Sequence, residues 1–428
     1  MMRRSVLALL AGVAAVSGCD VPVRHLDTGG IELGGAGGRG GEDGEGGSCA
    51  RGFVVVGSDY QSTNVSLLEP SGAVLSPSFI SSASSPAGLS AALSGDVVLP
   101  SAPQRGDDVV LIDRSAGAVL TWVELRSGSV AAQLSVATGF ASDPHDYVEL
   151  SPTKAYVPRF KPNLDPGQEA FDAGSDVLVI DPSVPRITKR IDLGSALADV
   201  PARFLPHPER ALRIGRHVIV LLGAYRADLC ETVPARLVVV DTATDEVVDW
   251  LELDGFHACW SLALSPAGDE LAVACAGEWG CENRSDVASS GVVRVHVGDE
   301  LSVVRSHRAT ELGEGPVAAG IAYASARRLL VTTAGQFAGI DGPAADDTLI
   351  ELDLETNESR VLLRSQEEPF TIGAVSCDPV CGVCFVTDAS RSGGVVHRMT
   401  VGEKGVDVSG TIRVNDQIGL PPRGLGRF

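Results

Sequence analysis

The sequence is poor in aromatic residues and in positive charge. Aromatics make up 5% of its 428 residues, and 34 lysines and arginines stand against 55 aspartates and glutamates, which gives a formal net charge of -21. Nucleic acids and anionic lipid surfaces are bound through a basic footprint that so acidic a chain does not provide. We therefore expect no nucleic-acid partner. We interpret the acidity as a source of solubility, with cation binding as the alternative.

Recognisable catalytic and cofactor motifs are also missing. The chain has no nucleophile elbow, phosphate-binding loop, haem-attachment CxxCH or zinc-binding HExxH pattern. No cofactor is therefore predicted, and the absence favours a non-enzymatic function. A divalent metal remains an alternative because histidines and acidic residues recur in the loops described below.

Beyond the first residues, the chain lacks sustained helical periodicity. It contains 49 glycines and 24 prolines, and Val, Leu and Ala dominate the apolar residues. Many short strands joined by tight turns have this composition, so the predicted fold class is all-β.

The N-terminus carries the longest apolar run. Arg3 and Arg4 precede an apolar segment over residues 6–16, which is too short to be a stable membrane span and has the organisation of a secretory signal. The residues Val16-Ser17-Gly18-Cys19 resemble the lipobox of bacterial lipoproteins. The resemblance implies that residues 1–18 are a lipoprotein signal peptide and that Cys19 is acylated and begins the mature chain.

An acylated Cys19 makes a lipid bilayer the first expected partner and the bacterial cell envelope, outside the cytoplasm, the expected location. Asp20 resembles an inner-membrane retention signal, but that rule differs between bacteria, so the inner and outer membranes stay open. Residues 19–51 are rich in glycine and predict a flexible tether. About 30 residues of such coil span roughly 30 Å on average.

Residues 259–308 contain a complete structural unit that recurs along residues 52–428. Apolar strands are expected at 260–265, 270–274, 291–297 and 301–306, separated by the turn Pro266-Ala267-Gly268-Asp269, a long polar loop and a Gly-Asp turn. A four-stranded meander cannot bury both faces alone, so such units stack on copies of themselves. We predict one domain in which the units close into a ring.

The count of units depends on the two chain ends. The first unit, at residues 53–76, supplies three strands without an innermost one, and residues 419–428 have the character of that missing strand. The second unit is ambiguous: segments 88–92 and 96–100 begin it, and three candidate strands at 109–113, 119–125 and 130–136 compete for two places. The prediction is a seven-bladed β-propeller closed by N- and C-terminal strands in one blade, which removes exposed sheet edges.

Several units resemble the YVTN-type β-propeller repeat family, in which a Ser-Pro-x-Gly hairpin precedes a strand of that name. The matching stretches are Ser265-Pro266-Ala267-Gly268 before Leu271-Ala272-Val273-Ala274, Ser151-Pro152 before Tyr156-Val157, and Phe385-Val386-Thr387-Asp388. The resemblance implies the architecture far more than any chemistry.

Eight cysteines remain besides Cys19, an even number that suits disulfides in an oxidising compartment. The ring divides them into two groups: Cys230, Cys259, Cys275 and Cys281 in the fourth and fifth blades, and Cys49, Cys377, Cys381 and Cys384 in blades one and seven. We predict that Cys49 pairs with one of the three in blade seven. The other pairings stay open. A thiolate metal site at Cys377, Cys381 and Cys384 is the disfavoured alternative because a fourth ligand is missing nearby.

A candidate ligand site lies where the loops entering the innermost strands meet at one mouth of the channel. The residues expected there are His145, Asp146, His207, His257, Glu314, Glu368 and Arg423. Imidazoles and carboxylates around one opening suit a polar ligand or a divalent metal. Long loops at 161–176, 224–235, 276–290 and 334–347 surround this mouth, and their acidic residues offer a weak calcium signal.

Two functional hypotheses follow. The preferred one is a monomeric, membrane-anchored, extracytoplasmic propeller that acts as a non-enzymatic binding or scaffolding lipoprotein for an unknown protein or polysaccharide. The alternative is a lactonase-like hydrolase or metal-dependent lyase that uses His145, His207 and His257 at the channel mouth.

Overall fold

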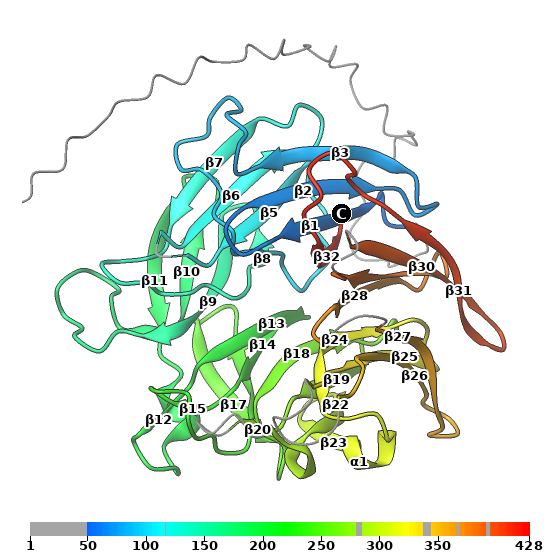
Figure 1. The fold of residues 1–428 in the computed structure, drawn as a ribbon. Coiled ribbons are helices and arrows are strands. Elements are labelled where there is room, and N and C mark those ends of the chain that lie inside the picture. The colour runs from blue at the N-terminus through cyan, green and yellow to red at the C-terminus, as the bar shows by residue number, and fades with distance from the viewer. Residues whose placement is uncertain (1–48, 116, 280–284, 337–343, 366–368, 391–393) are drawn as a thin grey trace, which may run out of the picture.

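The structure is a computed structural model that describes residues 49–428 except 116, 280–284, 337–343, 366–368 and 391–393. Seven four-stranded antiparallel sheets stand around a central axis as the blades of a β-propeller, as Figure 1 shows. The predicted fold class and blade number are confirmed. Among the described residues, no helix has the length and apolar character that crossing a membrane requires.

We number the blades in chain order and give their strands from the innermost outwards. Blade 1 holds β32 (Pro422–Arg427), β1 (Phe53–Ser58), β2 (Thr63–Leu68) and β3 (Val74–Ser81); blade 2 holds β4 (Val97–Val98), β5 (Asp108–Asp113), β6 (Val119–Glu124) and β7 (Val130–Ser135); blade 3 holds β8 (Val148–Ser151), β9 (Lys154–Pro162), β10 (Gly174–Asp181) and β11 (Arg186–Ile191); blade 4 holds β13 (Pro208–Ile214), β14 (His217–Leu222), β16 (Arg236–Asp241) and β17 (Glu246–Glu252).

The remaining blades follow the same order. Blade 5 holds β18 (Cys259–Leu264), β19 (Glu270–Cys275), β22 (Gly291–Val297) and β23 (Leu301–Arg308); blade 6 holds β24 (Val317–Tyr323), β25 (Arg328–Thr333), β26 (Thr348–Asp353) and β27 (Ser359–Arg364); blade 7 holds β28 (Ile372–Asp378), β29 (Val383–Asp388), β30 (Val395–Gly402) and β31 (Gly405–Ile412). Short additions decorate the loops: the pairs β12 (Phe204–Leu205) with β15 (Tyr225–Arg226) and β20 (Glu278–Trp279) with β21 (Ser285–Asp286), the 3-10 turns η1 (Gly194–Leu197) and η2 (Val287–Ser289), and the helix α1 (Ala309–Leu312).

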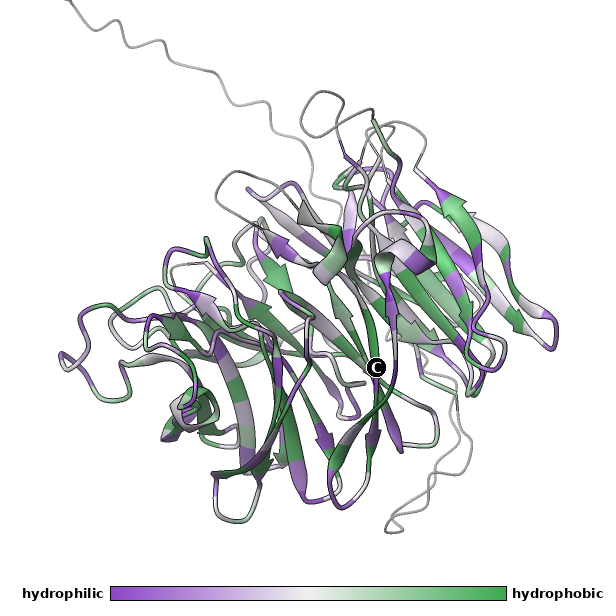
Figure 2. Ribbon diagram, turned by 90° about the horizontal axis from the view of Figure 1, so that it is seen from below, coloured by the Kyte–Doolittle hydropathy of each residue, from purple (hydrophilic) through white to green (hydrophobic). Residues whose placement is uncertain are grey.

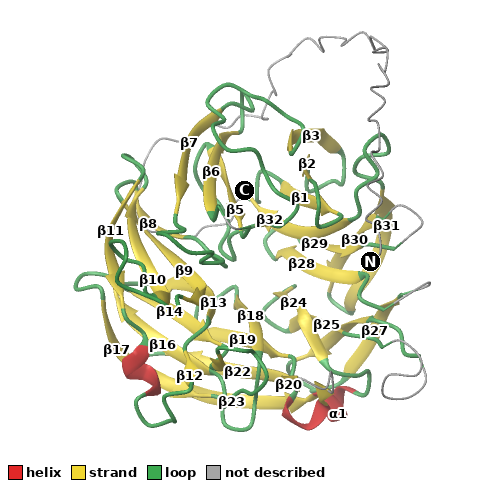
Figure 3. Cartoon of the chain, turned by 60° about the vertical axis from the view of Figure 1, so that its left-hand side comes forward, coloured by secondary structure: helices red, strands yellow, loops and turns green. Residues whose placement is uncertain are grey.

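The ring closes as the sequence predicts. The C-terminal strand β32 pairs antiparallel with β1, with Phe53 opposite Arg427 and Val56 opposite Gly424, and Figure 3 shows it beside β1. Gly52 and Phe428 exchange two backbone hydrogen bonds at the end of the pair. The first and last strands of the described chain therefore belong to one sheet.

Blade 2 corrects one expectation. Segment 88–92 is not a strand: it begins at Gly88, whose φ of 83° suits a turn, and Gln133 of β7 holds the backbone amides of Ser90 and Ala91 at 2.8 Å. Residues 97–98 form the innermost strand, and all three competing segments become β5, β6 and β7. The prolines at 100 and 103 offer no amide for a longer inner strand.

Two faces of the ring differ in their connections. We call the loop face the one that carries the links from second to third strand and from the fourth strand to the next blade; the opposite turn face carries the tight hairpins. Between blades the core is apolar, and Figure 2 shows hydrophobic residues along the strands and hydrophilic ones in many of the loops. Between blades 3 and 4, for example, Tyr156, Val179, Val218 and Val220 are all below 5% exposed.

Disulfides bear out the predicted grouping. Cys49 pairs with Cys381 on the turn face, which joins blade 1 to blade 7, as expected. Cys259–Cys275 and Cys377–Cys384 each tie an innermost strand to its neighbour. Cys230 is also disulfide-bonded, whereas Cys19 and Cys281 lie outside the described residues.

Candidate functional site

Three of the predicted residues precede the innermost strands of successive blades on the loop face. His145, His207 and His257 lie just before β8, β13 and β18. Close to each, a residue other than glycine takes a left-handed backbone: Asp143 at φ 54°, His207 at 46° and Ala258 at 46°. Such conformations cost free energy and persist where surrounding contacts impose them. The described chain has ten further positions of this kind, so the contacts of the three histidines decide whether they form a site.

His145 lies between two carboxylates. Its Nδ1 is 2.8 Å from Oε2 of Glu209, and its Nε2 is 3.4 Å from Oδ1 of Asp143. Burial opposes protonation, but the charge and hydrogen bond of Glu209 and of Asp143 outweigh it and raise the pKa of His145. Desolvation likewise works against ionised Asp143, yet His145 and Lys161 hold the pKa of Asp143 below its usual value. The cluster thus favours an imidazolium held by two carboxylates.

Aromatic rings connect His145 to His207. The ring of Phe160 stacks on His145 with centroids 4.5 Å apart and contacts His207 at 4.7 Å on its other side. Tyr225 meets His207 edge to face at 5.6 Å. His207 is 1% exposed, and neither ring nitrogen makes a well-formed hydrogen bond within the described residues. Desolvation lowers the pKa of His207 to about 4, partly opposed by the Phe160 backbone, so this imidazole stays neutral beside a charged one.

Asp146 has a structural role in the wall of the channel. It is fully buried and accepts hydrogen bonds from the backbone amides of Ser101 in blade 2, Tyr147 in blade 3 and Ala211 in blade 4, each at 2.8 to 2.9 Å. Burial raises its pKa, with Arg210 opposing the shift. The carboxylate ties three consecutive blades together and is not presented to solvent.

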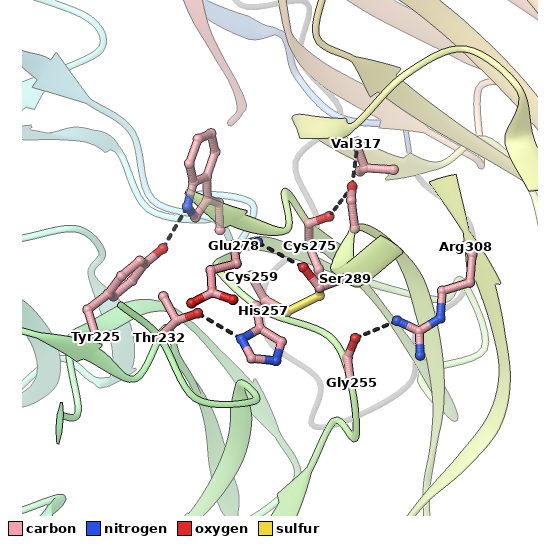
Figure 4. The surroundings of a disulfide bond; sticks show 12 residues. Tyr225, Thr232, Gly255, His257, Cys259, Cys275, Glu278, Ser289, Arg308 and Val317 are labelled. Atoms are coloured by element: carbon pink, nitrogen blue, oxygen red, sulfur yellow. Dashed lines mark hydrogen bonds between the residues drawn. A yellow bond between two sulfur atoms is a disulfide. The ribbon is translucent and has the colours of Figure 1, made fainter. Parts of the chain in front are cut away.

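His257 belongs to a neighbouring group centred on the disulfide Cys259–Cys275, drawn in Figure 4. Its Nδ1 is 2.8 Å from the hydroxyl of Thr232. In the same group the indole of Trp260 donates to the Tyr225 hydroxyl at 2.8 Å, which links the group to the His207 ring. The structure therefore brings His145 and His207 together and places His257 one blade further round the ring.

The other predicted mouth residues are separate. Glu314 forms an ion pair with Arg364 at 2.8 Å. Arg423 donates to the Ser58 carbonyl at 3.0 Å and covers the Tyr60 ring at 4.7 Å. Glu368 lies outside the described residues. Glu314 and Arg423 thus have partners other than the three histidines.

The described residues offer little for a metal ion. Within them, the single group of three close ligand atoms is Cys49, Asp378 and Cys381, and its two sulfurs form the disulfide. Among the acids of the long loops, Asp172 accepts three backbone amides, Asp347 accepts four, and Asp176 is bonded to buried Arg159. These carboxylates already have partners within the protein.

Sequence reasoning missed Asp143, Glu209, Phe160 and Tyr225. Asp143 and Glu209 each lie two residues from a predicted histidine, so their positions in the sequence could have identified them as neighbours of the histidines. Phe160 lies near the end of the second strand β9 and Tyr225 follows the second strand β14. Their approach to the histidines depends on the stacking of neighbouring blades. The sequence gives no sign of that distance.

Comparisons with known proteins identify the fold and no family. No protein-family model and no curated protein matches the chain, so membership in the YVTN repeat family is not shown. Solved structures with a similar fold include a periplasmic gluconolactonase of Pseudomonas aeruginosa, with 14% identity, a TM-score of 0.54 and coverage of 88% of this chain and 98% of that one.

Two further structures share the fold. The β-propeller domain of Cps50 (Swd1) from Myceliophteria thermophila has 13% identity and a TM-score of 0.52 over 84% of this chain and 98% of that one. A Lactobacillus plantarum protein has 10% identity and a TM-score of 0.53 over 89% of this chain and all of that one. At such identities the likeness extends to the fold alone, and the chain is a seven-bladed β-propeller whose solved neighbours include a gluconolactonase.

Proposed function

We propose that this protein is a lipid-anchored, extracytoplasmic binding protein whose loop face captures a protein partner. The observation that carries the proposal is the distribution of exposed apolar side chains. Tyr60, Leu164, Leu229, Phe370 and Ile418, between 43% and 80% exposed, all lie in connections of the loop face. The tight hairpins of the turn face expose Val184 and Val380, and the outermost strands expose Val74, Val248, Trp250, Val303, Val304 and Val408. Exposed apolar anchors gathered on one face are typical of interaction surfaces.

The position of Cys49 supports this use of the loop face. Cys49 ends the proposed tether and is bonded to Cys381 on the turn face. An acyl anchor at Cys19 therefore connects to the side of the ring opposite the apolar loops. This leaves the loop face accessible to a partner in the surrounding compartment.

Capture is tested with purified protein immobilised through its C-terminus and incubated with the solubilised native envelope. The triple variant Tyr60→Ser, Leu164→Ser and Leu229→Ser is expected to lose the captured protein while its thermal unfolding stays unchanged. The matched control carries Val184→Ser and Val380→Ser on the turn face and retains capture. Equal capture by the two variants would contradict the proposal, as would a captured species that proves to be polysaccharide.

Anchoring is tested separately. Cys19→Ala should move the protein from the membrane to the soluble fraction and abolish labelling by a palmitate analogue. Unchanged membrane association would overturn the acylation while leaving the loop-face capture result standing.

A second candidate function, lactone hydrolysis, has one specific observation in its favour. His145 is paired with Glu209 at 2.8 Å beside Asp143, a constellation suited to proton transfer, and one solved structural neighbour is a gluconolactonase. The test is gluconolactone hydrolysis followed by pH-stat with wild type, Glu209→Gln and the turn-face control. Activity lost in Glu209→Gln alone favours the enzyme, and no activity above the spontaneous rate excludes this reaction.

A further inference from the structure

A pocket lies at the seam where the ring closes, away from the histidines. Its volume is about 170 Å³, and β1 and β2 supply one wall while residues 413–422, which lead from β31 to β32, supply the other. A water molecule takes about 30 Å³ in the liquid. The pocket is therefore the size of a small metabolite and too small for a sugar chain or a folded peptide.

Its floor is polar where an interface between blades is ordinarily apolar. Val65 and Leu67 of β2 face blade 2 and join an apolar core there. Asn64 and Ser66, on the opposite side of the same strand, line the pocket at 3% and 2% exposure. Buried polar side chains are the informative exceptions in a protein core.

The walls are held rigidly by one carbonyl group. The backbone oxygen of Pro77 in β3 accepts from Nδ2 of Asn64 at 3.0 Å, from Oγ of Ser66 at 2.7 Å and from Nδ2 of Asn415 at 2.7 Å. Asn415 in turn holds the amides of Gln417 and Ile418. The loop that covers the pocket is thus fixed to blade 1 before any ligand binds, which lowers the entropic cost of binding.

Two opposite charges line the rim. Arg413 and Asp416 are exposed, and within the part of the chain that the structure describes neither has a hydrogen-bonding or ion-pair partner. Val55, Val414 and Leu420 add apolar surface to the lining of the pocket. A ligand with a carboxylate, an ammonium group and a short side chain matches each of these features.

We infer that the seam pocket binds a small zwitterion of the free α-amino acid class, with its carboxylate at Arg413 and its ammonium group at Asp416. Such a ligand contacts strands from the N-terminal end of the domain and the loop before its last strand. Binding therefore favours the closed ring over any state in which β32 leaves blade 1. The segment that lines the pocket also carries Ile418 of the loop face, but the inference does not depend on the capture proposed above.

The experiment combines isothermal titration calorimetry with thermal unfolding of the oxidised protein. L-Alanine and L-serine are the zwitterionic probes, propionate and ethylamine carry one charge each, and glycerol is neutral. Each amino acid is added at about 10 mM. If this concentration is about 100 times the Kd, binding is expected to raise the Tm of the protein by about 2 to 5 °C. Propionate, ethylamine and glycerol should leave Tm unchanged.

Variants assign the charges. Arg413→Gln and Asp416→Asn are each expected to weaken binding of the amino acid about tenfold or more. Neither substitution should change the Tm of the unliganded protein, because neither residue has a partner among the described residues. Arg126→Gln, an exposed arginine in the turn between β6 and β7, is the matched control and keeps full affinity. Absence of binding by both amino acids, equal binding of propionate, or unchanged affinity in the two rim variants would each overturn the inference.

Discussion

The interface between blades 3 and 4 and the seam between blades 7 and 1 each hold two neighbouring sheets together, but they do so with different contacts. Of the described residues, thirteen buried apolar ones form the cluster between blades 3 and 4, and seven form the seam cluster, where Phe53 meets Phe385 edge to face at 4.6 Å. The seam has a polar pocket in place of further apolar contact. It compensates with a shared sheet and the Cys49–Cys381 disulfide.

The comparison shows why the two regions suit different tasks. Between blades 3 and 4 a larger apolar cluster fills the interface, and Asp146 adds hydrogen bonds to the backbone of both blades. The loops above this interface can therefore carry a strained, charged cluster around His145. At the seam the chain also runs directly from β31 to β32, but β32 is attached to the rest of blade 1 through its pairing with β1, which lies far away in sequence. Topological and covalent links there free some of the interface to be polar.

The largest effect is expected from removing the shared strand. Truncation after Leu420 deletes β32 and leaves β1 without its inner neighbour. The loss is comparable to the whole stability of a domain, about 5 to 15 kcal/mol, so cooperative thermal unfolding should disappear. Phe428→Ala, which keeps the strand and removes one side chain that is 4% exposed, should cost about 3 to 5 kcal/mol and preserve cooperativity. A truncated chain that unfolds cooperatively would show that closure is dispensable.

The two kinds of disulfide sharpen the comparison. Cys49–Cys381 closes a loop of 332 residues and Cys259–Cys275 one of 16. The chain-entropy relation gives a stabilisation of roughly 5 to 6 kcal/mol for the first and roughly 3 kcal/mol for the second. Paired Cys→Ala variants compared by denaturant unfolding measure the difference. A larger loss for the short loop would contradict the latch role of the seam disulfide.

Buried and rim arginines should behave oppositely. Arg159 is fully buried and bonded to Asp176 at 2.8 Å, and the partly exposed Arg190 lies 3.6 Å from the same carboxylate. Arg159→Leu removes the buried partner of Asp176 and should cost about 3 kcal/mol. Arg413→Gln at the seam should change the free energy of unfolding by less than about 0.5 kcal/mol. Urea unfolding of both variants makes the comparison, and similar losses would mean that Arg413 has a structural partner.

The two histidines of the loop-face cluster predict opposite pH dependences. His145, with its pKa raised above 6.5, contributes stability that is full below pH 6.5 and is lost as pH rises through the folded value. His207, with its pKa lowered to about 4, makes stability fall by about 3 kcal/mol as pH drops from 6.5 to 4. His207→Gln should remove the loss of stability between pH 6.5 and pH 4, and His145→Gln should remove the loss of stability above pH 6.5. The free energy of unfolding is measured across this pH range. If His207→Gln loses as much stability below pH 6.5 as the wild type, His207 is not a buried neutral imidazole.

Much of the fold was predictable because each blade repeats local signals. Turn chemistry such as Pro266-Ala267-Gly268-Asp269 marks hairpins, and the missing inner strand of the first unit identifies residues 419–428 as its completion. Blade 2 was harder because Gly88 begins a turn that only its contact with β7 explains. Local pattern does not encode that contact.

The candidate site was less predictable than the fold. Position in the repeat placed His145 and His207 before innermost strands on one face, but it did not indicate that Glu314 and Arg423, predicted at the same mouth, have partners of their own. The seam pocket had a visible signal in the alternation Asn64, Val65, Ser66, Leu67, where polar residues occupy a side that other strands fill with apolar ones. Its meaning depends on residues 413–422, which the fold alone brings there.

Peptide mapping of the unreduced protein by mass spectrometry tests the closed ring most directly. The account predicts a peptide containing Cys49 linked to one containing Cys381, with Cys377 linked to Cys384. Linkage of Cys49 to Cys230 or Cys259 would place the first strands away from blade 7 and contradict the closed ring, and a free thiol at Cys49 would contradict the disulfide that latches it.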